Sequence, residues 1–464
     1  MNEGSSKWQK AQEGRELENR CWEYLKPLLE ELHKKVDRRL VKTMLDLVLV
    51  ILMHRNRNSG LLLSELGDHL LGGERGPAGV KRIASLLHSK RWRSGLIWKY
   101  LWGQADERVK ELRQQNEEIY VIWDESVLEK SESLQAERLC AVRSSKAARL
   151  KRIKPGYFNP PGGRPIFVPG FHWLQLLVTG LKGTPVLAHL SWWTTRGKKA
   201  STKREMEGKI LRKVARLWGR KVIHLWDRGF AGAPWTILAL DHRLRFVVRW
   251  NTRYHLIGPD GRKQEGWKIA RGKRSWNHRL IWDARRRCKR DTGIIAFPVH
   301  LPEDERPLFL VVSRPGSGRK PWYLLTSEPV HTSEQAWSIV FAYARRWQIE
   351  MSLRFTKSEM AFESPRLLAW QARLKFLLIA SLAYAFLLSL LPNTDFLFQL
   401  ISTFCHRTGK WSQVVSAPLY RLRLALSRLW LAFRPHSLPP LTSGGVMSTF
   451  ILILHPAIRS DGHL

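Results

Sequence analysis

Residues 118–126 read EIYVIWDES, an apolar run that ends in acidic and polar residues and decides the fold. A short run of this kind predicts a buried β-strand. Four more strand candidates and two helix-like stretches follow. The strands are FHWLQLLVTG (171–180), TPVLAHLSWW (184–193), KVIHLWD (221–227) and LRFVVRW (244–250), and the helices span 201–217 and 233–242. The order β-β-β-α-β-α-β predicts an α/β fold, with a mixed sheet flanked by helices.

The sequence on either side of this block has a different character. Residues 8 to about 112 read as helical, interrupted by GGERGPAG at 72–79, whereas 251–330 holds short strand-like runs such as GIIAFPV and LFLVVSR. The predicted division is a helical N-terminal region (1–115), the first part of the core (116–250), an inserted, mainly β subdomain (251–330), further core helices (331–391) and a basic C-terminal tail without assignment (392–464).

The charge of the chain indicates a polyanionic partner. The chain has 78 Lys and Arg against 40 Asp and Glu, a net charge of +38. Nucleic acid and an anionic membrane surface both suit such a charge, which concerns association rather than fold. FLLIASLAYAFLLSLL at 376–391 carries no charge, but its sixteen residues fall short of a membrane span and predict a buried core helix. We therefore expect no membrane partner.

Cysteine usage and the N-terminus indicate an intracellular protein. Cys21, Cys140, Cys288 and Cys405 lie far apart and show no metal-ligand spacing, so we expect reduced thiols and no zinc site. The polar start MNEGSSKWQK has no apolar core of a secretory signal. The expected location is the cytoplasm, in association with the nucleoid.

A basic helix candidate follows the glycine-rich interruption. VKRIASLLHSKRW at 80–92 places Ile83 and Leu86 on one face and Lys81 and Arg82 largely elsewhere. Two helices across a turn, the second one basic, are typical of a DNA-binding helix pair. An ordinary solvated amphipathic helix has the same pattern, and the turn is longer than usual. Lys81 and Arg82 are candidate DNA contacts.

Two aspartates follow apolar runs that predict strands. Asp124 comes after IYVIW and Asp227 after VIHLW, so each is expected to project from a strand end. Two aspartates on neighbouring strands can share divalent metal ions, as phosphoryl transfer with Mg²⁺ or Mn²⁺ requires. Each residue alone is also compatible with an acid that caps the next turn.

A third candidate acid lies in YARRWQIEMSLRFTK, residues 343–357. Tyr343, Arg346, Glu350 and Lys357 are spaced Y-x2-R-x3-E-x6-K, which on one helix places all four within an arc of roughly 60°. Glu350 would complete the metal shell, while the phenol and the two cations would hold DNA phosphates. The alternative is a helix stabilised by an Arg346 to Glu350 ion pair one turn apart.

WDESVLEK around Asp124, WDRGF around Asp227 and the Y-x2-R-x3-E-x6-K series together resemble the insertion-sequence-four family of bacterial DDE transposases. The resemblance spans roughly residues 40 to 390. It implies an RNase H-like core with the β subdomain inserted between the second Asp and the Glu, and two Mg²⁺ or Mn²⁺ ions held by Asp124, Asp227 and Glu350. It further implies cleavage at transposon ends by activated water, attack of the freed 3′-OH on target DNA, and a homodimer on paired double-stranded ends.

Aromatic and basic residues gain meaning beside these motifs. Residues 271–290 carry nine Lys or Arg against the single acid Asp283, and 22 tryptophans are present in the chain. The resemblance implies that Trp322, in PWYLLTSEPV, stacks on a base flipped out near the cleavage site, although a core tryptophan of a strand has the same pattern. We expect Trp347 to pack beside Arg346.

Two other functions remain open at this point. A retired transposase kept only for DNA binding would share the fold and the charge, but all three acids and both basic partners are present. A cellular nuclease on the same core would lack the complete Tyr343 to Lys357 series. The sequence therefore favours an active transposase.

Overall fold

Five strands at the centre of the molecule follow the predicted order. The computed structural model describes residues 3–130, 135–147, 165–283, 288–316, 319–405 and 418–432. The strands, in spatial order, are β4 (Val186–Trp193), β3 (Phe167–Thr179), β1 (Tyr120–Glu129), β5 (Ile223–Trp226) and β6 (Arg245–Arg249). The pairs β4–β3 and β3–β1 are antiparallel, and β1–β5 and β5–β6 are parallel. This is an RNase H-like sheet, as predicted. The sequence missed one short strand, β2 (Cys140–Arg143), which pairs with β3.

Both faces of the sheet are covered, and the side chains of β1 alternate between two hydrophobic clusters. Tyr120 and Ile122 pack into one cluster, whereas Val121 and Trp123 pack into the other. The second cluster includes residues of α5 (Gly95–Gln114), α7 (Lys203–Leu217) and α8 (Ala233–Asp241). The parallel strands need such helical crossovers, because a tight turn can join only antiparallel neighbours.

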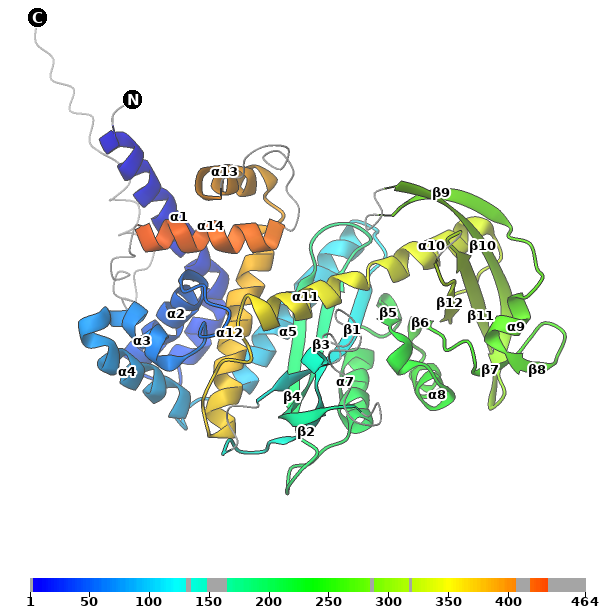
Figure 1. The fold of residues 1–464 in the computed structure, drawn as a ribbon, viewed down its shortest axis with the longest axis horizontal. Helices are drawn as coiled ribbons and strands as arrows, with labels where there is room; N and C mark the ends of the chain where they lie inside the picture. Colours follow the sequence, from blue (N-terminus) through cyan, green and yellow to red (C-terminus); the bar gives the residue numbers. More distant parts are fainter. Residues whose placement is uncertain are drawn as a thin grey trace, which may run out of the picture.

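The inserted strands extend the same sheet. They are β7 (His255–Ile257), β8 (Lys263–Glu265), β9 (Asn277–Asp283), β10 (Cys288–Leu301), β11 (Asp304–Arg314) and β12 (Trp322–Thr326), with the short helix α9 (Gly266–Ala270) after β8. β12 pairs antiparallel with β6, so core and insertion form one 12-stranded sheet within the described residues. Figure 1 shows the insertion as the green lobe at the right.

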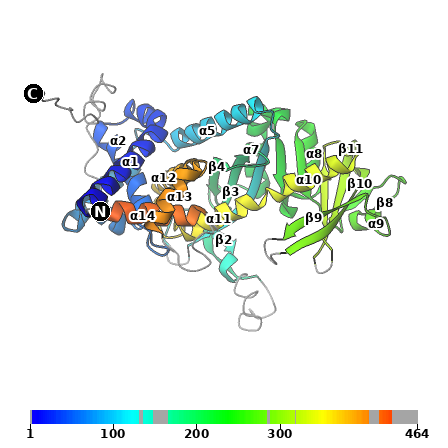
Figure 2. The ribbon, with the colours of Figure 1, turned by 90° about the horizontal axis from the view of Figure 1, so that it is seen from above.

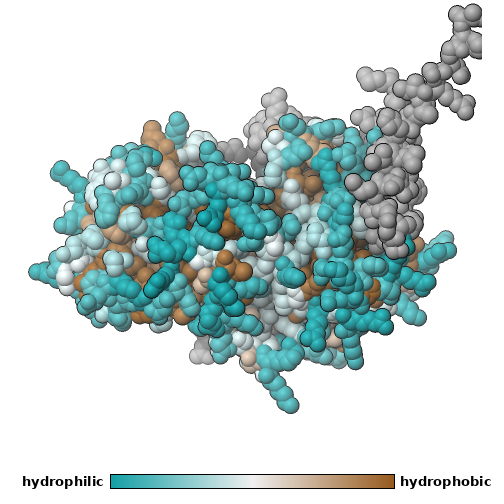
Figure 3. Space-filling model, turned by 180° about the vertical axis from the view of Figure 1, so that it is seen from behind, coloured by the Kyte–Doolittle hydropathy of each residue, from teal (hydrophilic) through white to brown (hydrophobic). Residues whose placement is uncertain are grey.

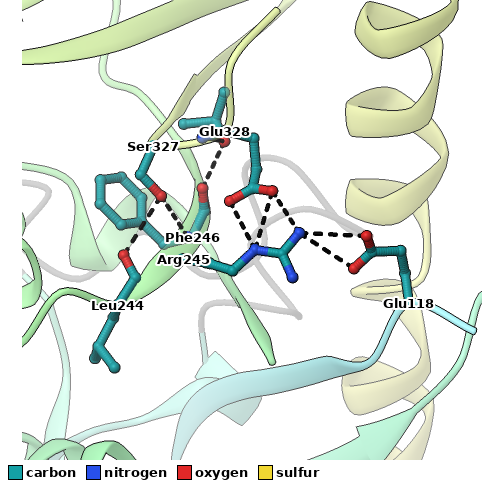
Figure 4. A network of polar contacts seen from close by, with 7 residues as sticks. Glu118, Leu244, Arg245, Phe246, Ser327 and Glu328 are labelled. Carbon is teal, nitrogen blue, oxygen red and sulfur yellow. Dashed lines mark hydrogen bonds and ion pairs between the residues drawn. The ribbon is translucent and has the colours of Figure 1, made fainter. Parts of the chain in front are cut away.

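A buried polar network fixes the point where the insertion returns to the core (Figure 4). Arg245, at the start of β6, donates to both carboxylate oxygens of Glu328 at 2.6–3.1 Å and also reaches Glu118 before β1. The backbone N–H of Phe246 donates to Ser327 at 2.9 Å. The end of β12 is therefore held to the starts of β6 and β1.

Helices gather at the other end of the molecule (Figure 1). They comprise α1 (Glu3–His33), α2 (Arg38–Met53), α3 (Leu63–Leu71), α4 (Gly76–His88), α12 (Trp370–Leu390), α13 (Thr394–Phe404) and α14 (Pro418–Ala432). α14 returns from the C-terminal region to pack against α1, α2 and α12. By length and composition α12 could cross a membrane, but 94% of its apolar window is buried. The prediction of a core helix there is confirmed.

The helix expected over residues 343–357 is two helices. α10 (Ser333–Ala344) and α11 (Trp347–Ser358) run nearly in line in Figures 1 and 2, from the insertion toward the helical end. Between them the backbone hydrogen bonds are of the tighter i to i−3 type, including Arg346 to Tyr343 at 3.0 Å. The single-helix prediction is wrong because this tighter stretch shifts the later residues around the axis.

The end of α11 is tied to the N-terminal helices by a buried carboxylate. Glu359 follows α11 and has a fully buried side chain, which pairs with Arg55 at 2.8 Å and with Arg57 at 2.5 Å. Both arginines follow α2. A nearby buried guanidinium, that of Arg423 on α14, has its pKa lowered by burial to about 9, although Glu359 acts to raise it. Glu359 therefore holds three segments of the chain together.

We predict that Glu359→Gln lowers the free energy of unfolding by about 3 kcal/mol, because the partly buried Arg55 and the buried Arg423 lose the charge of a fully buried carboxylate. Thermal or urea denaturation measures the change. The matched control is Glu334→Gln, since Glu334 pairs with Arg279 but is 70% exposed; its cost should stay under about 1 kcal/mol. Equal effects of the two variants would contradict an anchoring role for Glu359.

Candidate active site

Asp124 lies in the middle of β1, not at its end. The strand continues to Glu129, so the strand-terminal prediction for Asp124 is wrong. The apolar run was mistaken for the whole strand, because VLE beyond the polar residues also pairs with β3. Asp124 does lie beyond the part of β1 that pairs with β5, which ends at Ile122 and Leu225. Its side chain is therefore at an opening of the sheet, and only 16% of it is exposed.

Asp227 directly follows β5, as predicted, and caps a short turn of 3-10 helix at Arg228–Phe230. Its Oδ1 accepts a hydrogen bond from the backbone N–H of Gly229 at 2.7 Å. Continuing the β1–β5 register by two residues past its last pair places Asp124 opposite Asp227. Both positions alternate onto the sheet face of Ile122 and Leu225, which belong to the same cluster as Ile349 of α11.

Arg346 joins the first and third acids. Its guanidinium lies 3.5 Å from Oδ2 of Asp124 and pairs with Glu350 one turn further along. The Arg346 to Glu350 pair weighed as an alternative is therefore present, but it also includes an acid from the central strand. Arg346 and Asp124 are 12% and 16% exposed, whereas Glu350 is 34% exposed. This is a partly buried site rather than a surface ion pair.

Electrostatic interactions show that the three acids lie close together. Burial, together with the negative charges of Asp227 and Glu350, raises the pKa of Asp124 to about 7, against the opposing charge of Arg346. Burial lowers the pKa of Arg346, but Tyr343 and the carboxylates outweigh it and leave that pKa above its ordinary value. The arginine therefore offsets negative charge that the site gathers.

Tyr343 and Trp322 stand beside Arg346. The rings of Trp322 and Tyr343 meet edge to face with centroids 5.3 Å apart, and the Arg346 guanidinium lies 5.9 Å from the Tyr343 ring. Tyr343 is 4% exposed, and burial raises its pKa. Trp322 is partly buried against the core. The structure thus brings together the two aromatics that the sequence proposed as DNA contacts.

The sequence did not single out Arg249, which ends β6. Its charge lowers the pKa of Tyr343, so it faces the same group of residues. The register pairs Arg249 with Leu324, two residues beyond Trp322. A signal was available, because Arg249 interrupts the apolar run LRFVVRW near its end, as Asp227 does after the neighbouring run VIHLW.

Lys357 and Trp347 lie on α11 at different distances from the acids. Burial lowers the pKa of Lys357, while Glu363, Glu129 and more weakly Asp124 raise it. Lys357 therefore lies nearer to Glu363 and Glu129 than to the three acids of the site. Trp347 is 61% exposed, so the prediction that it packs beside Arg346 is wrong. As the first residue of α11, it lies outside the turns that pack on the sheet.

Lys81 and Arg82 lie far from these residues in the fold, on α4. Lys81 is exposed. Arg82 donates to Thr43 at 2.9 Å and lies 3.7 Å from Asp46, both on α2. Arg82 thus has a contact within the helical region, whereas Lys81 is free to meet solvent.

The acids fit a divalent cation by their chemistry, though not yet by their spacing. Oxygen-only carboxylate sets suit Mg²⁺ and Mn²⁺. The repulsion that raises the pKa of Asp124 is relieved by added positive charge. Within the described ranges no three Asp, Glu, His or Cys side chains converge closely enough to hold one ion, and Arg346 lies between Asp124 and Glu350.

An RNase H-like sheet with three acids around one arginine is the arrangement that the resemblance to DDE transposases implies. Residues 158–386 match the family described as the transposase DDE domain, which supports a DDE transposase. The matched segment contains Asp227 and Glu350 and begins after Asp124. A comparison with curated proteins gives no match. Among solved structures, the chain is similar to a piggyBac transposase synaptic complex with hairpin DNA, at 13% identity and TM-score 0.43, covering 86% of this chain and 72% of that chain.

We predict that Asp124→Asn is more stable than the unaltered protein at pH 8 and that the difference narrows toward pH 4. The folded-state pKa of about 7 exceeds the ordinary 3.8, so the favourable contribution of this carboxyl is lost as the pH rises through that window. The expected difference at pH 8 is at most about 4 kcal/mol. Thermal denaturation across this pH range measures it.

The control is Asp260→Asn, whose carboxylate is 50% exposed in a turn. It should show no such pH trend. At pH 8, Mg²⁺ or Mn²⁺ should raise the Tm of the unaltered protein and of the control more than that of Asp124→Asn. Parallel pH curves for all three proteins would contradict the assigned electrostatics.

Proposed function

We propose that this protein is a transposase of the insertion-sequence-four kind, which cuts DNA at transposon ends and joins them to target DNA. One observation carries the proposal: the charges of Asp227, at the end of β5, and of Glu350, on α11, both act on Asp124 of β1, while Arg346 pairs with Asp124 and Glu350. The transposase DDE domain match over 158–386 supports it. The net charge of +38 suits a double-stranded DNA partner.

In this proposal Asp124, Asp227 and Glu350 hold two Mg²⁺ or Mn²⁺ ions. When bound, the ions supply positive charge that activates water and offsets charge developing on the phosphate. Water oxygen bonds to phosphorus while the bond to the 3′ oxygen breaks, which leaves a free 3′-OH. That hydroxyl then attacks a target phosphate and displaces the target's own 3′ oxygen. No covalent bond to the protein forms.

The surrounding residues bind and orient DNA. Arg346, released from Asp124, offers a planar donor fork to a phosphate near the scissile one. Tyr343 and Arg249 lie beside it, and Lys357 lies about 10 Å along the helix from Glu350, within reach of a different phosphate. Trp322 presents an aromatic ring next to Tyr343 for an extruded base. A homodimer on paired ends and a nucleoid location complete the proposal.

The acids are tested by Asp124→Asn, Asp227→Asn and Glu350→Gln. Each substitution keeps the side-chain shape and removes charge, so we expect loss of cleavage by at least about a thousandfold with DNA binding largely intact. Cleavage of duplexes carrying the element ends, with Mg²⁺ or Mn²⁺, provides the measurement. Asp260→Asn is the control, because its carboxylate is 50% exposed in a turn of the insertion. Full cleavage activity in any of the three site variants contradicts the assignment of that acid. If the unaltered protein binds DNA but does not cleave it, the protein is a retired transposase.

The two cations on the catalytic segment should respond differently to exchange. Arg346→Lys loses the planar fork and stays defective by about a hundredfold, whereas Lys357→Arg keeps a point charge and most of the activity. Strand cleavage and strand transfer on uncut and pre-cut ends, at fixed salt, separate the steps. Normal activity of Arg346→Lys would mean that Arg346 serves only as an ion-pair partner of Glu350.

A further inference from the structure

The β9–β10 ribbon stands at the outer edge of the insertion, and its two faces differ. β9 pairs antiparallel with β10 over seven positions, from Asn277–Ile294 to Asp283–Cys288. Its inner face packs on α10, because Asn277 accepts from the Trp337 indole at 3.0 Å and Arg279 pairs with Glu334. The alternate residues of β9 must therefore point outward.

The outward residues are apolar and exposed. Leu280 is 67% exposed and Trp282 60%, while Trp276, just before the strand, is 46% exposed. Large apolar side chains gathered on one face of a strand are unusual on a protein without a partner there. In Figure 3, brown atoms project from the top of the lobe at the left, which the insertion forms. This face has the features of a binding surface.

Positive charge surrounds these apolar side chains. The register sets the exposed Lys289 directly across from Trp282. Arg271, Lys273 and Arg274, which precede Trp276, are exposed as well. The acid on this face, Asp291, lies 3.1 Å from His278, so its charge has a local partner. The charge is complementary to a polyanion rather than to a second copy of this basic chain.

We propose that this outward face, formed by Trp276, Leu280, Trp282 and Lys289, is a second DNA-binding surface that takes duplex DNA. A two-stranded β-ribbon fits the major groove, where leucine and tryptophan can contact thymine methyl groups. Lys289 lies beside them to meet a phosphate. The inference deepens the proposed function, since it places DNA on the insertion as well as at the acids. Binding without metal tests it separately from cleavage.

Leu280→Cys in a Cys288→Ser background places a thiol probe on this face, because Leu280 is outward-facing and exposed. The other three cysteines, Cys21, Cys140 and Cys405, are buried. We expect a 30-base-pair duplex of arbitrary sequence, in EDTA, to slow maleimide labelling of this thiol several-fold, with Cys288→Ser alone as the blank. Unchanged labelling at saturating duplex overturns the proposal. Labelling that slows as the protein concentration rises, with no DNA present, also overturns the proposal, because it shows that the face binds a second copy of this chain.

Variants test the same face by affinity. Trp282→Ala should weaken duplex binding several-fold with little change in salt dependence, because it removes an apolar groove contact and no charge. Lys289→Ala should reduce the log-log salt slope by about 0.9, the contribution of one phosphate. Phe398→Ala, at a 53% exposed aromatic on α13, is the matched control and should change neither. If the Trp282→Ala protein does not fold, the Lys289→Ala measurement alone decides the test, because the Lys289 side chain is exposed. Unchanged affinity and slope, or an effect only on single-stranded DNA, contradict the proposal.

Discussion

Parallel pairing of β1 with β5 is the constraint on which the site depends. The pairing stops after Ile122 and Leu225, and the next outward-facing residues on that side of the sheet are Asp124 and Asp227. Hydrogen bonding in a parallel pair is evenly spaced, so a slip of one residue would turn one acid to the opposite face. Apolar side chains above and below the sheet forbid that slip, because they fill two separate clusters. The packing of the core therefore sets the strand register that brings Asp124 and Asp227 to the same face of the sheet.

The acids come together at an energetic cost that Arg346 offsets. Burial and the negative charges of Asp227 and Glu350 raise the pKa of Asp124 well above its ordinary range. The guanidinium of Arg346, just before α11, pairs with two of the three acids, Asp124 and Glu350. In the function we propose, Arg346 leaves these acids when a cation binds, and its donor fork takes a DNA phosphate as a new anionic partner.

The elements on either side of the core hold α10 and α11 in place. Arg245 and Glu328 fix the end of the insertion, from which α10 starts, and Glu359 fixes the end of α11 to the N-terminal helices. The segment that carries Tyr343, Arg346 and Glu350 thus spans the molecule between two partly buried ion-pair networks. The insertion and the helical end, far apart in Figure 1, are joined through this segment.

The sequence determined the order of the core strands, because buried strands are continuous apolar runs. It also indicated the two aspartates, because acids interrupt those runs visibly. It also indicated Glu350 and Arg346, since their spacing on a helix is local. Only the tertiary structure decided that Asp124 lies inside its strand, that the helix is interrupted before Trp347, and that Arg249 joins the site. Pairing partners and helix junctions depend on contacts between residues distant in sequence. A local pattern carries no information about those contacts.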